Sequence, residues 1–222
     1  MSATTAVTLT KAFSISTALI ASGGIASLSL FDIPGLQSQP ASRSLPMIRW
    51  LFSRGSHIFP PASALSSAGF LYLAYISSPA LASRAFGETV RLALSNGKVQ
   101  GYLIAVALTF SIAPFTANLM IPTNFALIKL NADLGGARSK EAGRQGDAKA
   151  GERSALDSVN GRGEGVDQWR DVSGPQVKTS RDASKEDDRK AKELLGKFGR
   201  SNMGRAILMG LGGVVGLLTS IG

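Results

Sequence analysis

The chain alternates between long apolar stretches and polar stretches rich in arginine and lysine. Four of the apolar stretches contain no Asp, Glu, Lys or Arg: residues 12–31, 55–83, 99–128 and 206–222. Each is close to the roughly 20 apolar residues that cross the core of a bilayer. A soluble helical bundle would show a polar face on each helix with a period near 3.6 residues, and these stretches show none. The pattern predicts an all-α protein, a bundle of four transmembrane helices.

The first apolar stretch could also be read as a cleaved signal peptide, because a lysine precedes it and small residues follow. Its apolar part continues through IASLSLF, which is longer than the usual signal core. We therefore expect a membrane helix here. The amphipathic stretch PMIRWLFSRG after it predicts a loop at the membrane interface, and Pro60 and Pro61 predict the start of the second helix.

The composition changes between the third and fourth apolar stretches. Residues 133–192 are rich in Gly, Arg, Lys, Asp, Glu and Ser and contain few apolar residues, which predicts a long disordered charged loop between the third and fourth helices. The expected domains are residues 1–132 with three membrane helices and the interfacial loop, the insertion 133–192, and residues 193–222 with the fourth helix. Lysine and arginine near the helix ends place both long loops in the cytosol.

Composition excludes several kinds of chemistry. The chain has no cysteine and one histidine, which excludes thiolate nucleophiles, iron–sulfur clusters and His-rich or Cys-ligated metal sites. The net charge of +9 fits basic residues flanking membrane helices better than a nucleic-acid partner, since the charges of the insertion are mixed. No nucleotide-binding fingerprint is present.

The third apolar stretch ends in FSIAPFTANLMIPTN, which combines two prolines with several polar residues. Pro114 and Pro122 cannot donate hydrogen bonds to the carbonyls four residues before them, so the helix has two weak points. Nearby polar side chains could repair the helix or hold it to a neighbour. They could also face a polar pocket near one membrane surface. The candidates are Thr116, Asn118, Thr123 and Asn124.

Three further residues could carry chemistry. His57 is the only side chain whose unperturbed pKa lies near neutrality, so it is the most economical general base. Arg54 and Arg205 could each anchor an oxyanion or a phenolate. The simpler alternatives are a structural or solvated histidine and an Arg205 that extends to the membrane interface. Gly212 and Gly216 have the spacing that allows close helix contact, including contact between two copies of the chain.

Several of these motifs resemble one known family. The segments RWLFSRGSHIFPP, APFTANLMIPTN and FGRSNMGRAILMGLGGVVGL are similar to the fungal anthrone oxygenases of aromatic polyketide pathways. The most specific motif is M-x-P-T-N, residues 120–124, and the resemblance covers approximately residues 12–131 and 195–221.

The resemblance implies an enzyme of secondary metabolism, a monooxygenase that oxidises a polyketide-derived anthrone to the anthraquinone with O₂. It implies no flavin, haem or metal cofactor. The implied partners are a small aromatic substrate, O₂ and membrane lipid. From the residues themselves we expect no nucleic-acid partner, and a homo-oligomer could form through the Gly212 and Gly216 face. The implied location is a multi-pass membrane protein of the endoplasmic reticulum or a related endomembrane.

The chemistry of an anthrone gives the candidate residues their expected roles. Its methylene group is acidic because the carbanion is an aromatic phenolate, so a base, oxyanion donors and an apolar site would suffice. The expected catalytic residues are His57, Asn118 and Asn124, and the expected substrate-binding residues are Arg54, Met120, Thr123 and Arg205.

Two other functions fit the same pattern. A small transporter would need polar residues along several helices, and only the third stretch is markedly polar. A non-enzymatic tetraspan scaffold needs no pocket and would tolerate the loss of Asn118 and Asn124.

Overall fold

The computed structural model describes residues 2–78, 95–145, 157, 166 and 169–222. Within these residues the regular structure is helical and no β-strand is formed, so the expected all-α class is confirmed for this part of the chain. The chain forms two compact units. The first unit contains Met1–Ala26, Phe59–Thr116 and Met203–Gly222, and the second contains Ser27–Ile58 and Ala117–Asn202.

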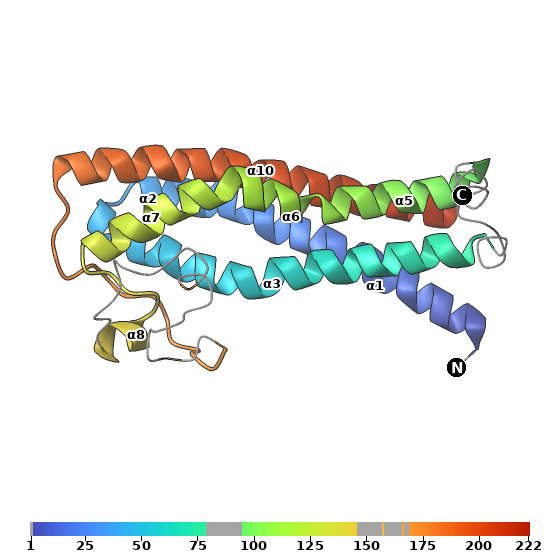
Figure 1. The fold of residues 1–222 in the computed structure, drawn as a ribbon, viewed down its shortest axis with the longest axis horizontal. Coiled ribbons are helices and arrows are strands. Elements are labelled where there is room, and N and C mark those ends of the chain that lie inside the picture. The colour runs from blue at the N-terminus through green and yellow to red at the C-terminus, as the bar shows by residue number, and fades with distance from the viewer. Residues whose placement is uncertain (1, 79–94, 146–156, 158–165, 167–168) are drawn as a thin grey trace. The chain divides into compact units, whose positions relative to one another are not determined.

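The helices follow one another with few breaks (Figure 1). Two short π-helices, which are frequent at functional sites, interrupt the first and third apolar stretches. In chain order the elements are α1 (Ala3–Ser27), the π-helix η1 (Leu28–Asp32), α2 (Ile33–Gln37), α3 (Ala41–Ile76), α5 (Gly97–Phe110), α6 (Ile112–Phe115), the π-helix η3 (Thr116–Met120), α7 (Ile121–Asp133), α8 (Lys140–Gln145) and α10 (Lys185–Ile221).

Three helical stretches among the described residues are long and apolar enough to cross a membrane: Ala3–Gln37, Gly97–Asp133 and Lys185–Ile221. They correspond to the first, third and fourth predicted membrane helices. The predicted second helix is not among them, so a bundle of four is not established. The apolar half of α3 contains two prolines and three serines at positions 60, 61, 63, 66 and 67, which lower its hydropathy.

The structure also corrects the expected interfacial loop before this helix. α3 is one continuous helix from Ala41 to Ile76, so PMIRWLFSRG is helical and Pro60 and Pro61 lie inside the helix. The two prolines leave the carbonyls of Ser56 and His57 without their usual helical donors, because proline has no N–H. The backbone hydrogen bonding of α3 is therefore interrupted next to His57.

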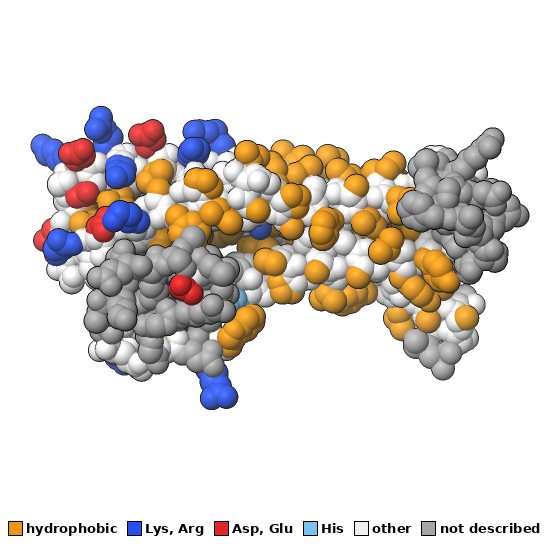
Figure 2. All heavy atoms as spheres, in the orientation of Figure 1, with side chains coloured by type: hydrophobic (Ala, Val, Ile, Leu, Met, Phe, Trp, Pro, Cys, Tyr) orange, Lys and Arg blue, Asp and Glu red, His pale blue; other side chains and the backbone are white. Residues whose placement is uncertain are grey.

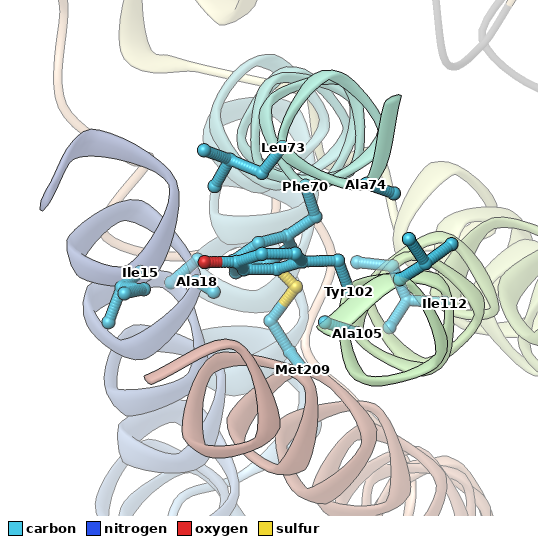
Figure 3. Packing of buried hydrophobic residues seen from close by; sticks show 11 residues of the cluster. Ile15, Ala18, Phe70, Leu73, Ala74, Tyr102, Ala105, Ile112 and Met209 are labelled. Atoms are coloured by element: carbon cyan, nitrogen blue, oxygen red, sulfur yellow. The ribbon is translucent and has the colours of Figure 1, made fainter. Parts of the chain in front are cut away.

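The core of the first unit is built from small, aliphatic and aromatic residues of five helices, α1, α3, α5, α6 and α10. Figure 3 shows the Tyr102 ring lying beside Phe70 of α3 and Met209 of α10, and the two ring centroids are 6.4 Å apart. Hydroxyl groups add hydrogen bonds between helices: Ser63 Oγ donates to the Thr109 carbonyl over 2.7 Å, and Ser67 Oγ lies 2.8 Å from Thr109 Oγ1. Such bonds hold helices together where no water competes.

The glycines of α10 pack inside this unit. A Cβ atom added at Gly212 would lie 2.6 Å from Thr109 Cγ2, and one added at Gly216 would lie 2.4 Å from the Phe70 ring. Both glycines are buried. The small-residue face is therefore used for packing within the chain, and it does not offer the free surface that the expected homo-oligomer contact requires.

In the second unit, α10 begins with a reciprocal cap. Ser184 Oγ accepts a hydrogen bond from the Asp187 backbone N–H, and Asp187 Oδ2 accepts one from the Ser184 N–H. Asp188 Oδ1 accepts from the Ala41 N–H over 2.7 Å, so α10 also caps the first turn of α3. Charged side chains gather over this first part of α10 in Figure 2, whereas hydrophobic side chains cover its later part.

The described residues of the insertion 133–192 are folded. α7 ends at Asp133 and is followed by Gly135, whose φ of +73° is favourable for glycine. The Arg181 N–H donates to the Leu134 carbonyl beside this turn. The Thr179 N–H donates to the Ser42 carbonyl of α3 over 2.8 Å. The expectation of disorder is therefore wrong for these residues, because polar groups pair where apolar burial is scarce. Residues 146–156, 158–165 and 167–168 lie outside the described residues.

Candidate active site

The site is built on one face of α3. Trp50, Arg54 and His57 are four and three residues apart, so they project from the same side of the helix. All three contact residues 169–174, which we call the arm. Trp50 Nε1 and Arg54 Nη2 each donate to the Ser173 carbonyl over 3.0 Å. The Arg54 guanidinium also lies 5.5 Å from the centroid of the Trp50 ring.

The contact between His57 and the arm is an aromatic stack. The His57 imidazole and the Trp169 indole are nearly parallel, with an angle of 8° between the planes and 4.0 Å between centroids. The indole is 72% exposed, whereas His57 is half-buried. His57 thus has a flat aromatic partner on one face of its ring.

The arm is fixed by the buried carboxylate of Asp171. Its Oδ2 accepts a hydrogen bond from Ser139 Oγ over 2.5 Å, and its Oδ1 accepts from the Ser173 N–H and Ser173 Oγ. Arg138 Nη2 lies 3.5 Å from Asp171 Oδ2. The Glu141 N–H donates to Ser173 Oγ over 3.2 Å. These contacts hold the arm in place at Asp171, two residues after Trp169.

The pKa of Asp171 lies below its ordinary value. Burial by itself raises the pKa of this carboxyl, but the hydrogen bonds from Ser139 and Ser173 and the positive charge of Arg138 lower it by more. The carboxylate is therefore ionised at neutral pH, and it acts as an acceptor for all these donors.

The hydrogen bonds of His57 define its tautomer. His57 Nδ1 lies 3.2 Å from Ser56 Oγ, and Ser56 Oγ donates its own hydrogen to the Ser53 carbonyl over 2.8 Å. Because a hydroxyl has a single hydrogen, this arrangement favours Ser56 as the acceptor and the proton of neutral His57 on Nδ1. Nε2 then carries the lone pair. This nitrogen is shielded from solvent.

A second group of predicted residues lies where η3 meets α7. Met120 and Thr123 are buried, with Met120 1% exposed, and Asn118 is exposed. The Asn124 Oδ1 atom is buried and has no hydrogen-bond partner among the described residues. A buried amide oxygen without a donor is costly, so this atom is a candidate acceptor for a hydroxyl group of a ligand.

The structure thus places six of the seven predicted site residues in the second unit. His57 and Arg54 share contacts with the arm, and Asn118, Met120, Thr123 and Asn124 form the group on η3 and α7. Arg205 belongs to the first unit, where it lies half-buried on α10, and the structure does not group it with His57.

Sequence reasoning missed the arm. Trp169 and Asp171 fall in the segment DQWRDVSG, which composition assigned to a disordered loop. Two signals could have identified it: a tryptophan isolated in a polar segment, and the Asp-x-Ser spacing, which allows a carboxylate to accept from the backbone two residues later.

The described residues define a class of protein, a helical membrane protein with an aromatic, histidine-containing site on α3. A comparison with protein families gives the particular family. The family model described as anthrone oxygenase matches residues 49–215, and the chain belongs to the anthrone oxygenase family. The match begins within α3 and includes the insertion 133–192. Neither the comparison with curated proteins nor the comparison with solved structures finds a match.

Proposed function

We propose that this protein converts a polyketide-derived anthrone and O₂ into the anthraquinone and water, without a flavin, haem or metal. Membership of the anthrone oxygenase family supports an oxygenase and a small aromatic substrate. The reaction removes both hydrogens of the anthrone methylene and inserts one oxygen atom of O₂ at that carbon, and the second oxygen atom leaves as water. It is a step of secondary metabolism.

The observation that carries the proposal is the geometry of His57. It is the only histidine of the chain, its Nε2 carries the lone pair and is shielded from solvent, and its ring lies flat against an aromatic ring. Proton abstraction from a flat aromatic substrate needs such a base, with the reacting carbon in the plane of the imidazole, where the Nε2 lone pair points. General bases placed in this way contribute about 10²-fold to 10⁴-fold to a rate.

The proposed chemistry starts with proton transfer. His57 Nε2 takes one methylene proton, and the electron pair is delocalised into the ring system as a phenolate. One electron passes to O₂ and the two radicals combine, which forms a C–O bond and leaves a peroxide anion. Protonated His57 returns its proton to this anion. The remaining hydrogen on that carbon then leaves as a proton, the O–O bond breaks, and the carbon becomes the second carbonyl as water is released.

The other residues of the second unit have proposed roles in binding. Arg54 uses one N–H for the Ser173 carbonyl, and a guanidinium has five, so further donors remain for a phenolate oxygen. Asn124 Oδ1 accepts a phenolic hydroxyl, and Thr123 and Asn118 supply further polar contacts. The buried Met120 side chain supplies an apolar wall. Arg205, in the first unit, is left out of this site.

A membrane location suits both reactants, because a flat polycyclic phenol and O₂ partition into apolar surroundings. The three apolar helices among the described residues support an integral membrane protein with lipid around it. We propose a multi-pass protein of the endoplasmic reticulum or a related endomembrane, with its long loops in the cytosol.

The test is oxygen uptake by the purified protein with an anthrone, in buffer that contains a metal chelator. The expected result is one O₂ consumed for each anthraquinone formed. Loss of activity on chelation would show that the metal-free part of the proposal is wrong. No oxygen uptake above the rate of the anthrone alone would overturn the enzyme and favour a scaffold or a transporter.

The Asn124→Ala and Asn118→Ala variants test the polar group on η3 and α7. Loss of a donor or acceptor that acts on the transition state costs about 10²-fold to 10³-fold in turnover. Membrane insertion and abundance equal to wild type are the controls. Wild-type rates in both variants would show that these asparagines only support the helix.

A further inference from the structure

The arm exposes two apolar side chains next to a buried carboxylate. Trp169 is 72% exposed and Val172 is 90% exposed, whereas Asp171 between them is buried. Single exposed apolar residues are common on protein surfaces, so their exposure alone does not identify a partner. The partner follows from the place at which the arm is attached to two helices of the second unit.

α3 holds the arm at the point where charge ends along the helix. Its first part carries three arginines, the last of which is Arg54, and no Asp, Glu, Lys or Arg follows from residue 55 to residue 76. Arg54 donates to the Ser173 carbonyl. Trp169 stacks on His57, which lies three residues further on and therefore about 4.5 Å further along the helix axis. The indole thus lies on the charge-free side of the arm.

α7 places the arm at a membrane surface independently. It forms the end of the stretch Gly97–Asp133, which is long and apolar enough to cross a membrane. After a turn, the Ala137 carbonyl accepts from the Asn131 side chain of α7 over 3.5 Å, so the chain returns beside the last turn of the helix. The next two residues hold Asp171 of the arm. The arm is therefore attached beside the end of a helix that can span a bilayer.

The residue types of the arm suit this level of a membrane. Tryptophan is enriched where lipid headgroups meet acyl chains, because the indole combines a flat apolar body with an N–H group. Arg170, next to Trp169, is exposed and carries the charge that headgroup phosphates attract. In water Trp169 and Val172 would expose apolar surface, whereas a lipid interface covers that surface.

We propose that the arm is a membrane-interface anchor, in which Trp169 and Val172 insert among the lipid headgroups of the leaflet on the side of the insertion 133–192. The indole then has the His57 imidazole on one face and lipid on the other. The anchor joins the insertion to the bilayer beside the candidate active site. It depends on the protein being embedded in a membrane and not on the reaction that the protein performs.

Depth-dependent fluorescence quenching tests the anchor. In a Trp50→Phe protein reconstituted into phosphatidylcholine vesicles, Trp169 is the only tryptophan of the chain. A nitroxide on the upper part of the lipid acyl chain should quench it more strongly than a nitroxide near the bilayer centre. Iodide, present on both sides of the membrane, should quench it weakly, and its emission should lie at shorter wavelength than that of tryptophan in water.

Two tryptophans introduced on α10 calibrate the depth in a protein that lacks both native tryptophans. Lys185→Trp lies in the exposed, charged first turn, where iodide should quench and lipid nitroxides should not. Leu211→Trp lies on the apolar part, where Leu211 is 50% exposed, and the deep nitroxide should quench it most. Trp50 itself donates to the Ser173 carbonyl, so the difference between wild type and Trp169→Phe gives the Trp169 signal with this hydrogen bond in place.

The outcomes separate lipid from water and from protein as the cover of the arm. Quenching of Trp169 by iodide to the level of Lys185→Trp, without quenching by lipid nitroxides, would overturn the anchor and place the indole in water. Protection from both quenchers would also overturn it, because protein would then cover the indole. Val172→Trp, in the protein without the native tryptophans, should report the same shallow depth, and a water-facing Val172→Trp would overturn the insertion of Val172.

Discussion

Arg138 and Asp171 are 33 positions apart in the sequence and form a buried ion pair, with 3.5 Å between Nη2 and Oδ2 and side-chain exposures of 1% and 3%. The pair joins the start of the insertion to the arm that contacts His57. Ser139 and Ser173 supply hydrogen bonds to the same carboxylate. A segment that composition describes as disordered thus contains a buried, hydrogen-bonded polar cluster.

Asp171→Asn should release the arm. Removing one charge from a buried pair leaves the other uncompensated and typically costs about 3–5 kcal/mol. We expect tryptic cleavage of the 133–184 segment to accelerate strongly in the purified protein. Asp182→Asn is the control, because its pair with Lys178 is exposed and should contribute less than about 1 kcal/mol. Equal protection in Asp171→Asn and Asp182→Asn would contradict the anchoring role of Asp171.

The attachment of the arm should depend on pH only in acid. The pKa of Asp171 is lower in the folded protein than in the unfolded chain, so its stabilisation is fully present above the unfolded value near 4 and is lost as pH falls through the folded value. Trp169 fluorescence in a Trp50→Phe, His57→Phe protein, which lacks the stacked imidazole that gains a proton in this range, should be constant from about pH 8 to pH 5. A transition in the neutral range would show that another group controls the arm.

Larger residues at Gly212 should destabilise the first unit without changing the oligomeric state. The backbone oxygen of Ala105 would lie 3.2 Å from an added Cβ, so the helices must separate to admit a side chain. Gly212→Leu should cost about 1–3 kcal/mol, measured by thermal unfolding in detergent. Leu217→Ala, at an exposed position of the same helix, is the control. If light scattering instead shows that Gly212→Leu loses a dimer while its thermal stability is unchanged, Gly212 forms a contact between two copies of the chain.

The charge pattern predicts the orientation of the insertion. Basic residues concentrate beside the two long loops, which places residues 133–192 in the cytosol. Protease added outside sealed microsomes should therefore cleave this segment and leave the apolar helices. Complete protection, with cleavage only after the vesicles are opened by detergent, would reverse the topology.

Sequence reasoning was strongest where one physical requirement acts along a continuous stretch. Three of the four charge-free stretches lie within the helices that are apolar enough to cross a membrane, because charge is costly in lipid. The residues of M-x-P-T-N and the lone His57 also pointed to the family that the comparison shows.

It failed where the decisive contacts join distant residues. The Asp171 anchor depends on Arg138 and Ser139, and neither composition nor local spacing reveals such a pairing. The hydropathy of the second predicted span was overestimated, because a stretch without charge can still contain enough serine and proline to lower its hydropathy. The Gly212 and Gly216 spacing identified a packing face correctly, but the spacing could not say which helices use it.

The His57→Phe variant separates the base from the stacking surface at one position. Phenylalanine keeps a flat ring against Trp169 but has no nitrogen, so the contact with the arm should remain while proton transfer is lost. We expect kcat for oxygen uptake to fall by about 10²-fold to 10⁴-fold, with anthraquinone affinity within a few-fold of wild type.

Ser56→Ala provides the matched comparison on the same helix turn. It removes the acceptor for His57 Nδ1–H and leaves Nε2 in place, so turnover should fall by only about 2-fold to 10-fold, the size of one hydrogen bond. A His57→Phe protein with wild-type kcat would exclude His57 as the base, and the proton acceptor would then have to lie on another element of the second unit. A Ser56→Ala protein as impaired as His57→Phe would instead show that the tautomer fixed by Ser56 controls the proton transfer.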